Sequence, residues 1–304
     1  MLEAPLTYTM PWRVRAVGLR RTLKLTKIIV PQIMATETAV YTHGETESVL
    51  RALYWRTATN SAAYLIPALR SDMRILDIGC GPGTITADLA KLVPNGDVVG
   101  VELAGDVLEK ARANAAALGV KNVQFVVGDV NGLAFPDGTF DVVHAHQVLQ
   151  HVGDPVRALR EMRRITKPGG IVAVRDTDFD TFTWFPDVEG MADFKEKYVH
   201  VQRANGGEPL AGRRLHAWAR EAGFDPAKIT KSSSTWCYGT PEERAWWGGL
   251  WADLIVSPGL TRTAISNGVA TKEELEQFAA ALCKWAGEED GWFALMHGEV
   301  LCRV

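Results

Sequence analysis

A glycine-rich loop that directly follows a short apolar segment constrains the fold of this chain most. Residues Arg74–Ile78 are predicted to form a buried strand, and the loop Gly79–Gly83 after it has glycine at every second position. Because glycine has no side chain, the backbone of such a loop can approach a ligand closely. The loop would lie at the carboxyl end of a strand, where open α/β sheets bind ligands. A dinucleotide-binding turn has the spacing G-x-G-x-x-G, whereas here the third glycine comes one residue early and Pro82 lies inside the loop.

Strands and helices alternate after this loop, a pattern typical of a parallel sheet with helices on both faces. Six further strands are predicted at 97–103, 123–127, 140–145, 171–175, 228–238 and 292–304. Helices are predicted at 47–69, 84–92, 104–118, 154–166, 194–204 and 213–222. The expected fold is a Rossmann-like α/β fold with a seven-stranded, mostly parallel sheet. A tryptophan-rich helical insertion at about 240–290, near the C-terminus, is expected to cover the sheet edge as a lid or an oligomer surface.

Residues 1–40 form a basic N-terminal extension with a different character. Six Arg and Lys residues and no acid lie between Pro11 and Pro31. Mitochondrial import recognises such N-termini, so the segment is a targeting leader, a solvated basic arm, or the product of a start codon placed too early. Met34 would then be the alternative start. The protein is otherwise expected to be cytoplasmic.

The composition excludes several classes of protein. The net charge of −3 and the pI of about 6.2 lack the basic excess that usually drives nucleic-acid binding. The four cysteines have no C-x-x-C spacing, so neither a disulfide framework nor a protein-bound metal is expected. No apolar run approaches the length of a membrane span.

Two acidic residues follow later strands. Glu102 ends the second strand, where a carboxylate can accept hydrogen bonds from two ribose hydroxyls, and Asp129 follows the third, where it can accept from an adenine amino group. Taken alone, the loop could be a tight turn, Glu102 a helix-start carboxylate and Asp129 a turn former. Their order at successive strand ends favours a nucleoside-containing cofactor, although a nicotinamide dinucleotide would also need the first acid.

Five segments carry a resemblance to a known family. The runs ILDIGCGPG, VVGVEL, VVGDV, FDVVHAHQVLQHV and LREMRRITKPGGIVAV resemble the class I S-adenosylmethionine-dependent methyltransferases, most of all the ubiquinone and menaquinone C-methyltransferase group. The resemblance implies a methyltransferase domain at 41–304, with a cofactor-binding half at 41–176 and an acceptor-side half that contains the insertion. It implies S-adenosyl-L-methionine as cofactor and a small-molecule acceptor that is quinone-like, a lipid or a secondary metabolite.

The resemblance also implies roles for single residues. The loop backbone would hold the methionine part of the cofactor, Asp77 its amino group, and Glu102 its ribose. The predicted cofactor-binding residues are Tyr41, Asp77, Gly79, Gly81, Gly83, Glu102, Leu103, Asp129, Val130, His146 and Gln147. Leu103, Asp129 and Val130 would lie at the adenine, and His146 and Gln147 would face the sulfonium. Tyr41 would belong to an N-terminal lid.

Methyl transfer depends largely on positioning and desolvation, and a base helps where the acceptor is a hydroxyl or an acidic carbon. Of the histidines His144, His146 and His151, the last two are the stronger candidate bases, and each has a structural hydrogen bond or a helix-start contact as the alternative. Asp176 and Asp178 would line the acceptor pocket or cap the next turn. Trp184 and Phe185 are expected in the pocket, whereas the tryptophans of the insertion favour a hydrophobic core. A nicotinamide-dependent oxidoreductase and a non-catalytic cofactor-binding protein are the competing functions, and a homodimer is possible.

Overall fold

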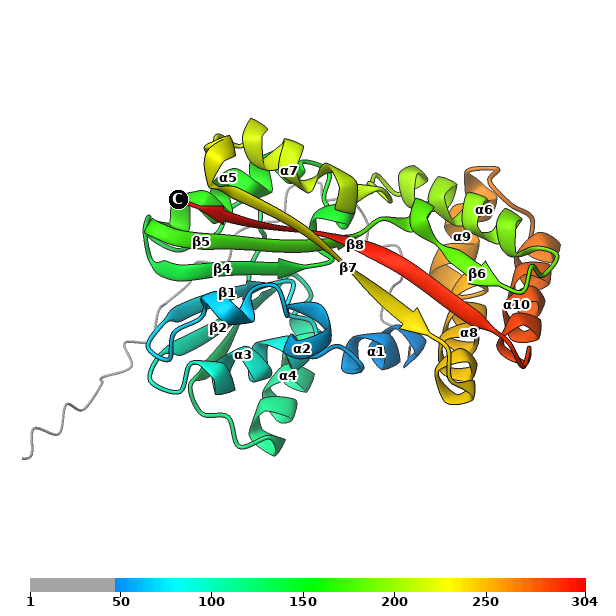
Figure 1. Ribbon diagram of the computed structural model, residues 1–304, viewed down its shortest axis with the longest axis horizontal. Coiled ribbons are helices and arrows are strands. Elements are labelled where there is room, and N and C mark those ends of the chain that lie inside the picture. The colour runs from blue at the N-terminus through cyan, green and yellow to red at the C-terminus, as the bar shows by residue number, and fades with distance from the viewer. Residues whose placement is uncertain (1–46) are drawn as a thin grey trace, which may run out of the picture. The chain divides into compact units, whose positions relative to one another are not determined.

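The computed structural model describes residues 47–304 (Figure 1). The basic extension at 1–40 and the predicted lid residue Tyr41 lie outside the described residues. Within 47–304, no helix combines the length and the apolar character that a membrane crossing requires.

The centre of the described chain is an eight-stranded sheet with the order β3-β2-β1-β4-β5-β8-β6, in which β7 also pairs with β8. The strands are β1 Arg74–Ile78, β2 Asp97–Glu102, β3 Val123–Val127, β4 Phe140–His146, β5 Thr166–Thr177, β6 Thr183–Phe185, β7 Ile229–Tyr238 and β8 Trp292–Arg303. The first five strands pair in parallel, and β8 runs antiparallel to β5, β6 and β7. The predicted α/β class with a mostly parallel sheet is confirmed. The additional strand, β6, has three residues, too few to show a period of two in the sequence.

Ten helices accompany the sheet in the described part of the chain. They are α1 Glu47–Tyr54, α2 Ala58–Ser61, α3 Thr84–Leu92, α4 Gly105–Ala117, α5 Pro155–Ile165, α6 Met191–Ala204, α7 Ala211–Glu221, α8 Pro241–Ile255, α9 Pro258–Ser266 and α10 Lys272–Ala286. Helix α5 begins as its sequence predicts, because the Asp154 side chain accepts a hydrogen bond from the backbone N–H of Arg157 and Pro155 occupies the first turn.

The continuous helix predicted at 47–69 is wrong. Helix α1 ends at Tyr54, a bend follows, and the four-residue α2 precedes a 3₁₀ turn at Ile66–Ala68. The side chains of Thr57 and Asn60 form a capping box that starts α2. These short polar side chains satisfy backbone donors locally and so compete with a continuing helix. The bend is important for the site because it carries Trp55 and Arg56.

Apolar side chains fill the space on both faces of the sheet and form a further core in the insertion. One sheet face packs against α5 and α7, and the other against α2 and α3. The predicted insertion consists of α8, α9 and α10, which gather with α6 around the end of β8 that pairs with β6 (Figure 1). Its core is rich in aromatic residues, among them Trp247, Trp251 and Trp285. The aromatic core thus lies beyond the carboxyl ends of β4 and β5.

Candidate functional site

The glycine loop has open space at one of its three glycines. Gly79, Gly81 and Gly83 have φ of 65°, 51° and 75°, a left-handed conformation that glycine adopts without strain. A Cβ on Gly79 would lie 2.5 Å from Cγ2 of Val148, and one on Gly83 would lie 2.9 Å from Phe125 Cζ. Among the described residues, the atom nearest to a Cβ on Gly81 would be Leu53 Cδ1, at 3.6 Å. Gly79 and Gly83 therefore serve packing, and a ligand can approach the loop backbone at Gly81.

Asp77, at the end of β1, is buried and holds the neighbouring strand and helix. One carboxylate oxygen is 2.7 Å from Nδ1 of His144 on β4, and the other accepts a 2.6 Å hydrogen bond from the Thr86 hydroxyl on α3. Both oxygens therefore have partners within the protein. The predicted contact with the amino group of the cofactor would have to share these oxygens.

Glu102 connects the end of β2 to the glycine loop. Its Oε2 accepts a 3.0 Å hydrogen bond from the backbone N–H of Gly81, and its Oε1 accepts one of 2.8 Å from the N–H of Leu103. The Leu103 side chain is exposed beside it. The structure thus brings Gly81, Glu102 and Leu103 together, as we expect for residues at the ends of neighbouring parallel strands.

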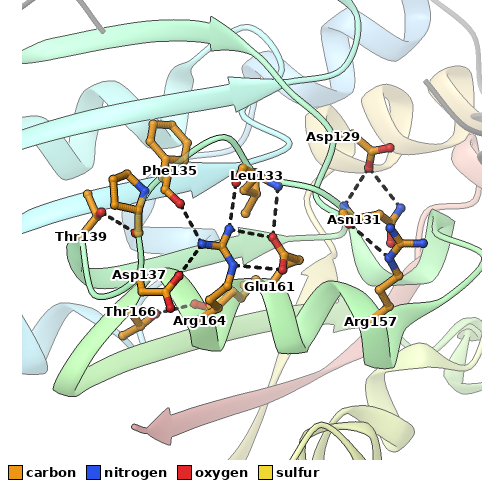
Figure 2. Close-up of polar contacts among 12 residues, drawn as sticks. Asp129, Asn131, Leu133, Phe135, Asp137, Thr139, Arg157, Glu161, Arg164 and Thr166 are labelled. Atoms are coloured by element: carbon orange, nitrogen blue, oxygen red, sulfur yellow. Dashed lines mark hydrogen bonds and ion pairs between the residues drawn. The ribbon is translucent and has the colours of Figure 1, made fainter. Parts of the chain in front are cut away.

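Asp129 lies in the loop between β3 and β4 and shapes its own turn (Figure 2). Its Oδ1 accepts hydrogen bonds from the backbone N–H of Asn131, at 2.8 Å, and from the Asn131 side-chain amide, at 3.1 Å. Arg157 on α5 donates to the Asn131 carbonyl at 3.2 Å. Val130 beside Asp129 is buried. The turn therefore leaves Oδ2 of Asp129 without any of these bonds.

Arg164 on α5 fixes the rest of this loop (Figure 2). It donates to the carbonyls of Leu133 and Phe135 at 2.9 and 2.8 Å, and it forms ion pairs with Glu161 and Asp137 at 2.8 and 2.7 Å. Glu161 in turn accepts from the backbone N–H of Leu133 at 3.2 Å. This anchor was not predictable from the sequence, because an Arg and a Glu three residues apart on a helix are also typical of an ordinary solvated pair.

Gln147, directly after β4, is the non-glycine residue of positive φ in the described chain, at 54°. Its backbone N–H donates to the carbonyl of Arg175 at 2.7 Å. Its side-chain NH₂ lies 2.8 Å from the Thr177 hydroxyl and 3.0 Å from Nε2 of His297, and its carbonyl accepts a 2.7 Å bond from Arg56. Backbone strain of this kind is common at functional sites, where the surroundings hold it.

The two candidate bases have different surroundings. His146 is buried next to Trp236, and neither ring nitrogen has a hydrogen-bond partner among the described residues. Burial, and then the charges of Arg175 and Arg56, hold the pKa of His146 well below its usual range, so the ring is neutral. His151, on the 3₁₀ turn Leu149–His151, lines a pocket, with its Nε2 3.0 Å from the Gln150 amide nitrogen.

This pocket, with about 700 Å³ of space including its mouth, opens at the end of β4. Eight aromatic side chains line it: Trp55, Phe179, Tyr198, Trp236, Tyr238, Trp246, Trp247 and Trp251. The polar lining residues are Arg56, Gln147, Gln150, His151 and Thr177. The lining also includes Leu53, which approaches Gly81, so the pocket adjoins the glycine loop. A concave site with a mostly apolar lining and a few polar groups suits a small organic molecule.

The expectation that Trp184 and Phe185 line the pocket is wrong. The Phe185 side chain is 57% exposed, and Trp184 stacks on Phe293 at a centroid distance of 6.4 Å. Neither borders the pocket, because β6 pairs with the far end of β8. Tryptophans of the insertion line it instead, and Trp247 and Trp251 belong to both the pocket and the aromatic core.

Asp176 lies near the end of β5, and Asp178 is the first residue after that strand. Neither of them borders the pocket. Asp176 is completely buried, and its Oδ1 accepts a 3.2 Å hydrogen bond from the backbone N–H of Gln150. Burial raises the pKa of Asp176 to about 8. Asp178 forms an ion pair with Arg213, with a 2.8 Å contact to Nη2. Both carboxyl groups therefore hold the surrounding turns and helices in place.

Comparison with known proteins decides the family. A family model described as a methyltransferase domain matches residues 69–223, half of the chain. The chain belongs to this methyltransferase family. An uncharacterized methyltransferase of Schizosaccharomyces pombe is 32% identical to it over 275 residues, which cover 88% of this chain and 98% of that protein. A demethylmenaquinone methyltransferase of Staphylococcus aureus is 32% identical over 175 residues, which cover 53% of this chain and 71% of that enzyme.

The fold of the methyltransferase is also found in solved structures. The YcgJ protein of Bacillus subtilis matches with a TM-score of 0.52 at 20% identity, over 80% of this chain and 97% of that one. The protein is an S-adenosylmethionine-dependent methyltransferase, and the alternative of a nicotinamide-dependent oxidoreductase is set aside. Within the described residues, no group of three or more His, Cys, Asp or Glu is placed to hold a metal ion.

The residues at the sheet edge fit this cofactor. The open face of Gly81 leaves space that a side chain would fill, and Glu102 stands beside it at the end of β2. One oxygen of Asp129 lies outside the bonds of its turn. The glycine loop follows β1, Glu102 ends β2 and Asp129 follows β3. In this order, they suit the amino acid part, the ribose and the adenine of the ligand.

Proposed function

We propose that the methyltransferase transfers a methyl group from S-adenosylmethionine to a small, largely apolar aromatic molecule bound in the pocket. The observation that supports this acceptor class most is the lining of eight aromatic side chains at the end of β4. Aromatic rings bury large areas and favour offset or edge-to-face contacts with other rings. The few polar groups lie together near Gln147, so they can orient the acceptor.

The cofactor, when bound, supplies an activated methyl group. Glu102 would bind its ribose, the loop at Gly81 its amino acid part, and Asp129 with Val130 its adenine. Gln147, held in its strained conformation by four hydrogen-bond contacts, would separate the cofactor side from the acceptor side. The aromatic walls exclude water from the acceptor and limit its orientations, which lowers the barrier to an in-line displacement.

Between the two candidate bases, the structure favours His151 for contact with an acceptor. His151 lines the pocket, whereas His146 does not. The lowered pKa of His146 also makes its ring a weak proton acceptor, because burial, and then the charges of Arg175 and Arg56, oppose a positive charge on the ring. We therefore assign His151 as the group that accepts a proton from an acceptor that arrives protonated.

The experiment that tests this function combines cofactor titration with a screen of acceptors. Calorimetry should show binding of S-adenosylhomocysteine, and Glu102→Ala should weaken it by roughly 10- to 100-fold, the value of one or two hydrogen bonds to a charged group. Glu109→Ala is the matched control, because Glu109 is exposed on α4 and forms an ion pair with Arg112 at 2.6 Å. Unchanged affinity in Glu102→Ala would show that the cofactor site lies elsewhere.

The acceptor screen uses S-adenosylmethionine with a labelled methyl group. We expect label in planar aromatic compounds and little in aliphatic amines, sugars, RNA or protein. Label that enters only RNA or protein would contradict the small-molecule acceptor. Binding of the cofactor product without transfer to any compound would favour a non-catalytic cofactor-binding protein.

A further inference from the structure

We infer that the aromatic acceptor carries a carbonyl oxygen at the edge remote from its methylated group, and that Tyr238, Trp247 and Trp251 bind this oxygen through their O–H and N–H groups. The inference rests on the proposed function, because it adds one chemical feature to the acceptor of the same pocket. It starts from the difference between the two ends of that pocket.

The inner end of the pocket lies where β4 and β5 end. There the Gln147 side-chain amide donates to the Thr177 hydroxyl at 2.8 Å, and both residues border the pocket. Thr177 lies opposite His297 of β8, whereas Tyr238 lies opposite Phe293 of the same strand. Four residues of β8, at about 3.3 Å each, separate these two positions by about 13 Å. Tyr238 therefore marks an outer end of the pocket, away from the residues that follow β4.

Helix α8 supplies the other rings of this outer end. Trp247 and Trp251 lie one turn apart on the same face of α8. The Trp247 ring stacks on Tyr238 with a centroid distance of 4.3 Å, and Trp251 meets Trp247 edge-on at 5.5 Å. All three side chains border the pocket and are 5% exposed or less. These three adjacent rings are the outer wall of the pocket.

The three polar atoms of the outer wall, one hydroxyl oxygen and two indole nitrogens, are buried without a hydrogen-bond partner among residues 47–304. Other tryptophans of the same aromatic core have partners there. Trp236 donates to the carbonyl of Asn60 at 2.8 Å, and Trp285 donates to the carbonyl of Phe185 at 3.1 Å. Buried polar groups are nearly always bonded, because an unbonded one costs free energy. A ligand in the pocket would supply the partner for the outer wall.

The chemistry of the outer wall selects the kind of partner. An indole N–H only donates hydrogen bonds. Burial raises the pKa of Tyr238 well above its usual value, so its hydroxyl keeps its proton and can donate as well. A carbonyl oxygen has two lone pairs and no hydrogen, so it can satisfy two of these donors at once. A carboxylate would also accept, but its desolvation among aromatic rings costs more free energy.

A carbonyl held at the outer wall would orient the whole acceptor. Its aromatic rings would lie between the outer wall and the inner end, and the opposite edge of the molecule would face Gln147. The methyl group would then be transferred to that opposite edge. Tyr238, Trp247 and Trp251 would therefore determine specificity without contact with the reacting atoms.

The test compares two neutral probes of the same shape, 2-acetylnaphthalene and 2-isopropenylnaphthalene, in which a C=CH₂ group replaces the C=O group. Equilibrium dialysis in the presence of S-adenosylhomocysteine gives a dissociation constant for each probe. We expect the wild-type protein to bind the ketone about tenfold more tightly than the alkene, because only the ketone accepts hydrogen bonds from the outer wall.

Substitutions in the outer wall should reduce this preference. Tyr238→Phe removes only the hydroxyl and should lower the ratio of the two dissociation constants about threefold. The double variant Trp247→Phe, Trp251→Phe should bind both probes more weakly, because it loses ring area, and should bring the ratio close to one. Tyr54→Phe is the matched control, because Tyr54 is 46% exposed on α1 and does not border the pocket. It should leave the ratio unchanged.

Calorimetry with S-adenosylhomocysteine confirms that each variant is folded, and Thr177→Val tests the inner end for comparison. Equal affinity of the wild-type protein for the two probes would overturn the carbonyl site while leaving the aromatic pocket intact. A ratio that falls in Thr177→Val but survives in Tyr238→Phe and in the double variant would place the carbonyl at the inner end and would equally overturn it. If neither probe binds, the proposed aromatic acceptor fails as well.

Discussion

Asp176 is the single residue with the clearest effect of pH on stability. It is completely buried at the end of β5, and burial raises its pKa to about 8, whereas an unfolded Asp has a pKa of about 3.9. Between these values the folded state binds a proton that the unfolded state releases. The free energy of unfolding should therefore fall as pH rises from about 4 to about 8, by at most about 1.4 kcal/mol per pH unit.

Asp176→Asn should flatten this dependence, because the amide keeps the shape of the protonated carboxyl and does not ionise. Urea denaturation at a series of pH values measures the slope for both proteins. Asp253→Asn serves as the control, because Asp253 is exposed and its substitution leaves the buried carboxyl unchanged. A slope in Asp176→Asn as steep as that of the wild type would assign the effect to another group.

Residues whose place depends only on a strand end were predictable. Glu102 reaches the glycine loop because it ends β2, and parallel strands end at one edge of the sheet. The difference between His146 and His151 was not predictable, because the 3₁₀ turn at Leu149–His151 decides which of them borders the pocket. Arg56 was missed for a similar reason, since it lies in a bend that the helical periodicity of its neighbours hides.

At the scale of elements, apolar runs predicted the central strands reliably, whereas the short polar segment that interrupts the first helical region did not predict the break there. Strands β1 and β4 and the second half of β5 are largely buried on both faces, and each carries a run of apolar residues. The break between α1 and α2 depends on two side chains, Thr57 and Asn60, that bond the backbone locally. The place of the insertion depends on contacts between segments far apart in the chain, which no local pattern encodes.

Helices α8 and α10 approach each other closely at one glycine, and this gives a prediction for the insertion. A Cβ on Gly248 would lie 2.7 Å from the Cβ of Ala286 and 2.9 Å from the carbonyl oxygen of Leu282, whereas one on Gly249 would meet no atom of residues 47–304 within 4 Å. We expect Gly248→Ala to lower the free energy of unfolding by about 1–3 kcal/mol, as overpacking does. Since α8 carries Trp247 and Trp251, it should also weaken binding of aromatic compounds.

Gly249→Ala on the same helix is the matched control. It should raise stability by up to about 1 kcal/mol, because alanine favours a helix and reduces the freedom of the unfolded chain. Urea denaturation of the two variants measures the difference. Equal effects of the two substitutions would mean that α8 and α10 do not pack as closely as the structure shows.

At the scale of the whole described chain, two strands join the aromatic core of the insertion to the sheet that carries the cofactor residues. Strands β7 and β8 pair along their length, from Ile229 opposite Cys302 to Tyr238 opposite Phe293. One end of β8 pairs with β5 and the other with β6. Neither core can lose these strands without exposing the other, so the two should unfold together.

Two spectroscopic probes distinguish a single unfolding transition of both cores from two separate unfolding transitions. Tryptophan fluorescence reports mainly on the insertion, since Trp236, Trp247, Trp251 and Trp285 belong to its core and Trp218 belongs to the sheet core. Far-ultraviolet circular dichroism reports on all helices and strands. We expect the same urea midpoint from both probes, and an equal shift of both midpoints when S-adenosylhomocysteine binds the folded state. An earlier fluorescence transition, unmoved by the ligand, would show that the insertion unfolds by itself and that the shared strands do not couple acceptor pocket and cofactor site.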